Sequence, residues 1–172
     1  QDSVRGNSLA LQSNSNGADG DVGTSQITAI GSDGFSLASG GDVNTNSRTY
    51  VCWQWKAGTS FSNDASSTSI GSVDSSGSVG ALQGLSIIKW TGNNTGGATI
   101  AHGLGTTPNA LIIKNRTDGG SSNWAVWHDK SFVNASDPNM LYLDTNAATA
   151  DDTNVRHTTV TTNSTVFSQR PV

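Results

Sequence analysis

Residues 85–90 read Leu-Ser-Ile-Ile-Lys-Trp, and the four residues after them read Thr-Gly-Asn-Asn. A short run rich in apolar and β-branched residues, closed by turn formers, is typical of a β-strand. The same pattern recurs along the chain, and no window keeps an apolar period of 3.6 residues. The predicted strands are 8–11, 25–30, 34–37, 49–56, 85–90, 98–101, 110–114, 124–128, 140–143 and one or two pieces within 155–166.

Composition favours the same fold class. Ser, Thr, Asn and Gly make up nearly half of the 172 residues, and charged residues only 13%. These residues disfavour long helices, because hydroxyl and amide side chains compete for backbone hydrogen bonds and glycine adds an entropic cost. Five Trp and four Phe supply enough apolar surface for a core, which argues against disorder. We therefore expect an all-β protein, an antiparallel β-sandwich of jelly-roll type.

Charge and hydropathy exclude several partners. The net charge is −4 and the nine basic residues are scattered, so no basic stripe for nucleic acid is present. No apolar run approaches the roughly 20 residues of a membrane span, so membrane insertion is not expected. The chain begins with Gln1 and shows no signal peptide, which suggests a processed chain or part of a longer protein. Cys52 is the single cysteine, and we expect a buried, inert thiol.

The chain divides into three segments in this interpretation. Residues 1–58 are the later part of a first β module, and residues 81–172 are a second β-sandwich module. Between them, residues 59–80 contain nine serines and few large apolar side chains. That composition predicts a flexible connection or a weakly anchored edge strand.

An internal repeat relates the two ends of the chain. A shift of 132 residues aligns 9–36 with 141–168 without a gap and gives eight identities in 28 pairs, including two Leu pairs and one Phe pair. The second module then stops before the strand that the first segment carries at 42–58. Either both ends are truncated modules of a tandem array, or 42–58 closes the sandwich within the chain or in a neighbouring subunit. Unpaired strand edges favour homo-oligomerisation.

Several motifs stand out within 84–143, and a further segment lies within 34–58. These stretches are Gly84–Gly92, Ile100–Gly105, Pro108, Leu111–Arg116, Asn123–His128, Gly34–Leu37 and Thr49–Gly58. Together they resemble a recurrent β-sandwich module of tail-fibre and virion structural proteins in marine tailed phages, in which the stretches within 34–58 match the closing segment. Residue 85 is Leu where that module usually has Phe.

Composition and the absence of a catalytic constellation in the sequence predict a non-enzymatic protein. The resemblance implies that it lies on the virion surface, in a tail fibre, a head fibre or a capsid decoration. Its partners would be further copies, other virion proteins and host surface polysaccharide, held by multivalent contacts. A secreted bacterial carbohydrate-binding or adhesin module is the alternative. A polysaccharide depolymerase would need paired carboxylates in a groove, and the acidic residues lie mostly in turn sequences instead.

Aromatic residues are the candidates for receptor binding, because apolar sugar faces stack on aromatic rings. Trp53 and Trp55 fall on one face of the predicted strand 49–56, and we expect them in the core. Outside it, the receptor-binding candidates are Trp90, Trp124, Trp127 and His128.

Two further motifs have simpler interpretations than catalysis or metal binding. Residues 102–105, His-Gly-Leu-Gly, suggest a tight turn with positive φ at the glycines, because no nucleophile motif accompanies them. Asp19, Asp21 and Asp42 lie in Asn- and Asp-rich loops that could supply oxygen ligands to a structural Ca²⁺. The loop at Asp42 departs from calcium-loop spacing, so Asx turns are the simpler interpretation. No other cofactor is expected.

Overall fold

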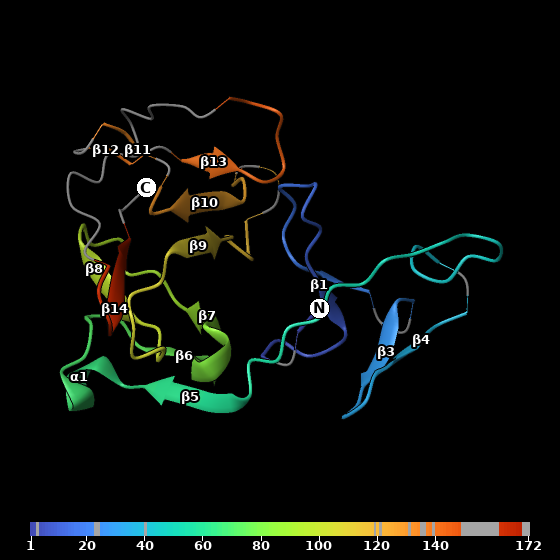
Figure 1. Ribbon diagram of the computed structural model, residues 1–172, viewed down its shortest axis with the longest axis horizontal. Coiled ribbons are helices and arrows are strands. Elements are labelled where there is room, and N and C mark those ends of the chain that lie inside the picture. Colours follow the sequence, from blue (N-terminus) through green and yellow to red (C-terminus); the bar gives the residue numbers. More distant parts are fainter. Residues whose placement is uncertain are drawn as a thin grey trace. The chain divides into compact units, whose positions relative to one another are not determined.

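A computed structural model describes residues 1–2, 4–22, 25–39, 41–118, 120, 122–130, 132–134, 137–138, 140–148 and 162–169. The chain is all-β, as predicted, and every named strand pair in it is antiparallel (Figure 1). In the part of the chain that is described, no helix is long and apolar enough to cross a membrane. Most of the prediction at 155–166 lies outside the described residues.

The chain forms two compact units. Unit 1 comprises Gln1–Gln54, Lys114–Trp124 and Leu143–Thr145. Unit 2 comprises Trp55–Ile113, Ala125–Tyr142 and Asn146–Val172. The first crossing between units therefore falls between Gln54 and Trp55, a few residues before the serine-rich segment.

Unit 1 contains two strand pairs. Strands β1 (Leu9–Ala10) and β2 (Gly20–Asp21) form one pair, and β3 (Ile27–Ile30) and β4 (Phe35–Leu37) form the other. The turn between β3 and β4 is closed by a hydrogen bond of 2.8 Å from the Gly31 amide to the Gly34 carbonyl. This hairpin agrees with the predicted strands 25–30 and 34–37, each of which it shortens at its N-terminal end.

Unit 2 contains a three-stranded sheet in the order β5-β6-β7. Its strands are β5 (Thr59–Asn63), β6 (Ser75–Gly80) and β7 (Leu85–Trp90). Helix α1 (Ala65–Thr68) follows β5 and is capped by Asp64, whose carboxylate accepts from two backbone amides. The 3₁₀ helix η1 (Ala81–Gln83) joins β6 to β7.

The serine-rich segment is thus largely ordered β structure. β5 fits the expected edge strand, but β6 is the central strand of the sheet, which neither alternative for 59–80 anticipated. Gly77 explains the position of β6. A Cβ built on Gly77 would lie 1.9 Å from the carbonyl oxygen of Ile87 on β7. Only glycine allows the two strands to approach this closely.

A second sheet of unit 2 has the order β13-β10-β9. Its strands are β9 (Ala110–Ile113), β10 (Ala125–His128) and β13 (Leu141–Tyr142). Two further pairs complete the described strands. They are β8 (Ala98–Ala101) with β14 (Val166–Gln169), and β11 (Phe132–Asn134) with β12 (Asp137–Pro138).

The core of unit 2 lies where these strands meet. Val73, Ala98, Ile100 and Phe167 form a buried cluster, which we call the core cluster. Ile88 and Trp90 of β7 and Leu111 and Ile113 of β9 pack against it. Strands β7 and β9 therefore cover the same core from two different sheets.

Residues 49–56 depart most from the prediction. They belong to no strand, Cys52 is exposed, and Trp53 and Trp55 are 77% and 69% exposed. The expected strand, buried thiol and core position of these two tryptophans are therefore wrong for the single chain. An alternating apolar pattern shows that a segment can be buried in a sheet, but burial also requires a neighbouring strand. The described part of this chain supplies none to residues 49–56.

Candidate functional site

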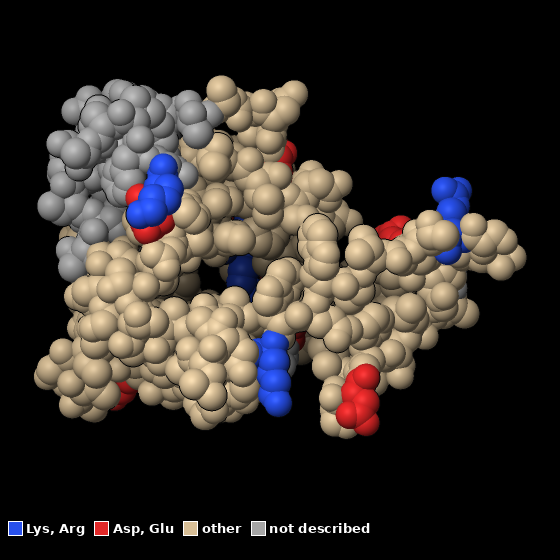
Figure 2. All heavy atoms as spheres, viewed as in Figure 1, with Lys and Arg blue, Asp and Glu red and all other residues tan. Residues whose placement is uncertain are grey.

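The exposed aromatic run is the candidate interaction site. We define residues 49–55, Thr-Tyr-Val-Cys-Trp-Gln-Trp, as the aromatic segment. Its sequence has no charged side chain, and its four large apolar residues are all more than half exposed: Tyr50 53%, Val51 80%, Trp53 77% and Trp55 69%. Contiguous exposed apolar surface of this kind marks interaction sites in soluble proteins. Charged side chains are few and scattered on the face shown in Figure 2.

The C-terminal end of the aromatic segment is anchored in unit 2. Ala57 is buried, and Gly58 has a φ of 67° just before β5. The carbonyl oxygen of Lys56 lies against Gly80 at the end of β6, where a Cβ would come within 2.7 Å of it. The chain thus enters the sheet beside the end of β6.

Trp90, the first receptor-binding candidate, lies in the core. Its ring packs edge-to-face on Phe167, with a centroid separation of 5.5 Å and an interplanar angle of 73°. This geometry is the favourable one for aromatic pairs. Trp90 is half-buried and acts as packing for the core cluster.

Trp124 holds together segments of unit 1 that are distant in sequence. Its indole Nε1 donates to the carbonyl oxygens of Gln12 and Ser15, each at 3.0 Å. Its backbone amide donates to the Asp144 carboxylate, also at 3.0 Å. The side chain is half-buried, so these contacts give Trp124 a structural role.

Trp127 and His128 are neighbours on β10. Trp127 is half-buried, whereas His128 is exposed. The His128 ring accepts at Nδ1 from the Lys130 amide at 3.0 Å. Successive residues of a strand point to opposite faces, so Trp127 and His128 do not share one face of β10. Trp90 lies in the core and Trp124 in unit 1, and the four candidates therefore form no common site.

His102 is a buried residue with both ring nitrogens hydrogen-bonded, and the sequence predicted only that it belongs to a turn. Its side chain is among the most buried in the described chain, at 1% exposed. Nδ1 accepts from the Leu104 amide at 3.2 Å, and Nε2 lies 3.0 Å from the Asn163 carbonyl oxygen. These partners require a neutral ring with its proton on Nε2. Burial lowers the pKa of His102. The positive φ predicted for the flanking glycines is confirmed, with 70° at Gly103 and 71° at Gly105.

The burial of the His102 ring predicts a loss of stability in mild acid. Because the pKa of His102 is lowered from its ordinary value of 6.5 in the folded chain, the unfolded chain binds the proton more tightly. Its contribution is complete above pH 6.5 and declines as the pH falls toward the lowered pKa. We expect the melting temperature to fall between pH 7 and pH 5, measured by circular dichroism.

The matched variant for this prediction is His102→Gln, whose side chain does not titrate. We expect it to be less stable at pH 7 and to show a flatter pH profile above pH 5, where carboxylates contribute little. Parallel profiles for the wild-type chain and this variant would contradict the assignment.

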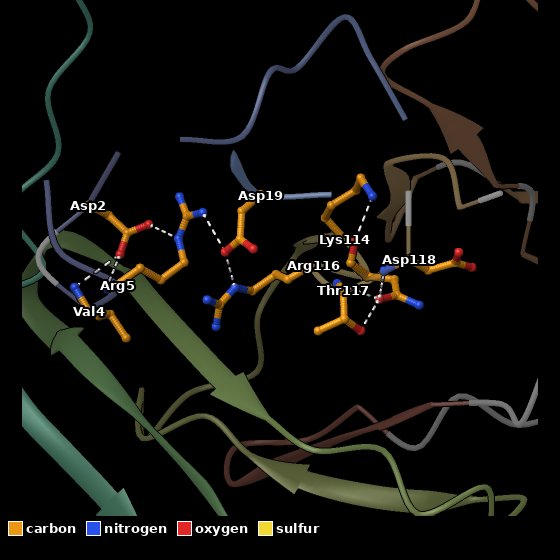
Figure 3. Close-up of polar contacts among 9 residues, drawn as sticks. Asp2, Val4, Arg5, Asp19, Lys114, Arg116, Thr117 and Asp118 are labelled. Carbon is orange, nitrogen blue, oxygen red and sulfur yellow. Dashed lines mark hydrogen bonds and ion pairs between the residues drawn. The ribbon is translucent and has the colours of Figure 1, made fainter. Parts of the chain in front are cut away.

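An ion-pair cluster anchors the N-terminal part of unit 1 (Figure 3). Arg5 Nε lies 2.6 Å from Asp2 Oδ2, and its Nη1 lies 3.6 Å from Asp19 Oδ2. Arg116 Nε donates to the same Asp19 oxygen at 2.7 Å, although the two residues are 97 positions apart. Burial raises the pKa of Asp2, but hydrogen bonds from Arg5 outweigh it and leave that pKa below its ordinary value.

The cluster bears on the calcium candidates. The Asp19 carboxylate is paired with two guanidinium groups, which oppose the binding of a cation there. Asp21 and Asp42 are both exposed, on β2 and in a loop respectively. Among the residues described, no three His, Cys, Asp or Glu side chains are gathered in a way that could hold a metal ion.

Comparison with known proteins gives a family and no function. A family model described as "Domain of unknown function (DUF7483)" matches residues 1–170. No curated protein and no solved structure matches the chain.

Proposed function

This chain belongs to the family described as Domain of unknown function (DUF7483), and we propose that it is a non-enzymatic surface component of a phage particle. The place on the particle would be a tail fibre, a head fibre or a capsid decoration. The role would be structural display and attachment to the host surface.

The main support for this proposal is the position of the motifs that resemble phage fibre modules. They coincide with four consecutive strands. Residues 84–92 contain β7, residues 100–105 begin in the last two residues of β8, residues 111–116 begin within β9, and residues 123–128 contain β10. The glycines of the 102–105 motif occupy the positive-φ turn. The resemblance therefore follows successive strands and the turns between them and not scattered identities, which supports a shared module.

Surface chemistry supports the same role. The chain has low charge and many hydroxyl and amide side chains, so it can form adaptable hydrogen bonds with polysaccharide. Each such contact is weak, and display in many copies raises the overall avidity through effective concentration. A virion surface provides that repetition.

The test is immunogold electron microscopy with antibodies raised against this chain. We expect gold particles on the tails or heads of phage purified from the source culture, and the chain among the proteins of those particles by mass spectrometry. The chain in the secreted fraction of phage-free cells, with unlabelled particles, would contradict the proposal and favour the bacterial adhesin.

A further inference from the structure

Residues 16 and 17, Asn-Gly, are the one Asn-Gly pair in the sequence. They lie in the connection between β1, which ends at Ala10, and β2, which begins at Gly20. In such a pair the backbone nitrogen of glycine can attack the side-chain amide carbon of asparagine, because glycine has no Cβ to hinder the approach and rotates freely. The pair is therefore a candidate for a reaction of the chain with itself.

Asn16 joins two segments of unit 1 that are distant in sequence. Its Nδ2 donates to the Gly120 carbonyl oxygen at 3.0 Å, and its own carbonyl oxygen accepts from the Gly120 amide at 3.4 Å. The preceding residue is held to the same segment, since the Ser15 carbonyl oxygen accepts from the Trp124 indole at 3.0 Å. We call residues 116–118, 120 and 122–124 the Gly120 segment. Asn16 is thus one of the residues that hold the β1–β2 connection to the Gly120 segment.

The reacting groups lie near solvent and behind weak contacts. Asn16 and Gly17 are half-buried, and Gly120 is exposed. Gly120 offers only its backbone to the contact, so the contact opens when two surface hydrogen bonds break. Openings of this kind in surface loops have small free energies. The Gly17 amide, which supplies the attacking nitrogen, donates to the Ser15 hydroxyl oxygen at 3.2 Å. The folded chain therefore reaches the reactive geometry by a local movement of one loop.

We propose that Asn16 is a site of spontaneous deamidation, and that the modification loosens the contact between the β1–β2 connection and the Gly120 segment. The Gly17 nitrogen forms a bond to Cγ of Asn16, its proton passes through solvent to the leaving Nδ2, and ammonia departs. Water then opens the resulting cyclic imide at either carbonyl carbon. One product has aspartate at position 16, and the other has isoaspartate, in which the backbone runs through Cγ. The proposal does not depend on a place for the chain on a virion.

The modification removes the side-chain donor of the contact with Gly120. A carboxylate at position 16 has acceptor oxygens and no N–H, so it cannot bond to the Gly120 carbonyl oxygen. The two groups repel each other instead, since both present negative charge. Isoaspartate also adds a methylene group to the main chain, which displaces the carbonyl group that accepts from the Gly120 amide. Both products therefore weaken the same contact of unit 1.

The first experiment follows position 16 by peptide mass spectrometry while the folded chain is incubated at mildly alkaline pH. We expect the peptide that contains Asn16 to gain the mass difference between a hydroxyl and an amino group, as a mixture of aspartate and isoaspartate. Gly17→Ala is the control and should retain most of its Asn16 over the same period. Its added Cβ would meet Ser15 Oγ at 3.4 Å, an ordinary contact, so we expect this variant to fold.

Two results of this experiment would overturn the proposal. One is a wild-type chain that keeps Asn16 unchanged throughout the incubation. The other is a Gly17→Ala chain that converts as fast as wild type, because the reaction would then not use an unhindered Gly17 nitrogen.

The second experiment measures the consequence with Asn16→Asp, which carries the aspartate product from the start. We expect a lower urea midpoint than that of the wild-type chain and faster hydrogen exchange of the Gly120 amide. Asn14→Asp is the matched control, since it adds the same charge at an exposed residue of the same connection and should keep the wild-type midpoint. An Asn16→Asp chain with wild-type stability and wild-type exchange at Gly120 would overturn the loosening of the contact.

Discussion

Replacing Gly77 by alanine is expected to lower the free energy of unfolding of unit 2 by more than about 4 kcal/mol, enough to prevent folding of a marginally stable domain. The added Cβ would lie 1.9 Å from the Ile87 carbonyl oxygen and 2.9 Å from its carbon. Both atoms belong to the backbone of β7, so no side-chain rotation relieves the clash. Strands β6 and β7 would have to separate, and β6 is the central strand of its sheet.

Chemical denaturation followed by tryptophan fluorescence measures this effect, since Trp90 packs against Phe167 in the core of unit 2. Gly20→Ala is the matched control, because Gly20 lies in strand β2 with no atom within 4 Å of an added Cβ and has no positive φ. That variant should stay within about 1 kcal/mol of wild type. A Gly77→Ala chain with the wild-type midpoint would refute the close approach of the two strands.

Asp19→Asn is expected to lower the free energy of unfolding by about 2 kcal/mol, through unit 1. The substitution keeps the shape of the side chain but leaves Arg5 and Arg116 without their shared carboxylate. The Arg5 side chain is only 10% exposed, so its charge is poorly solvated once a partner is lost. Arg116 is 35% exposed and Asp2 still pairs with Arg5, which keeps the effect below that of a fully buried pair.

The control for Asp19→Asn is Asp33→Asn, which removes a carboxylate from the exposed β3–β4 turn. We expect a change within about 0.5 kcal/mol for the control, as for most surface substitutions. Urea denaturation of both variants in the same buffer makes the comparison. Equal stabilities would show that the pairing of Arg5 and Arg116 with Asp19 contributes little to unit 1.

Local patterns were sufficient for most strands. β7 and β8 have the bounds expected from their apolar runs, and β9 and β10 differ from prediction by one residue each. These segments pack in the core of unit 2 or lie beside strands that do, so their pattern of apolar residues reflects their surroundings. The 102–105 turn was also predictable, because positive φ is a property of glycine itself.

Long-range contacts escaped prediction. Nothing near Asp19 in the sequence points to Arg116, and nothing near Trp124 points to the Gln12 and Ser15 carbonyls. β6 was missed for a related reason. Its small residues carry no apolar pattern, and its central position depends on backbone contact with β7.

By itself, the sequence determined that this protein is all-β and where most of its strands and turns lie, because backbone propensity and alternation act over a few residues. Only the tertiary structure decided which strands are neighbours, which aromatic residues are buried and which carboxylates meet guanidinium groups. Those outcomes depend on residues that are distant in sequence and lie on a neighbouring strand or on the opposite side of a core. The aromatic segment shows the difference: residues 49–55 have the pattern of a strand, and the described part of the chain gives them no neighbouring strand.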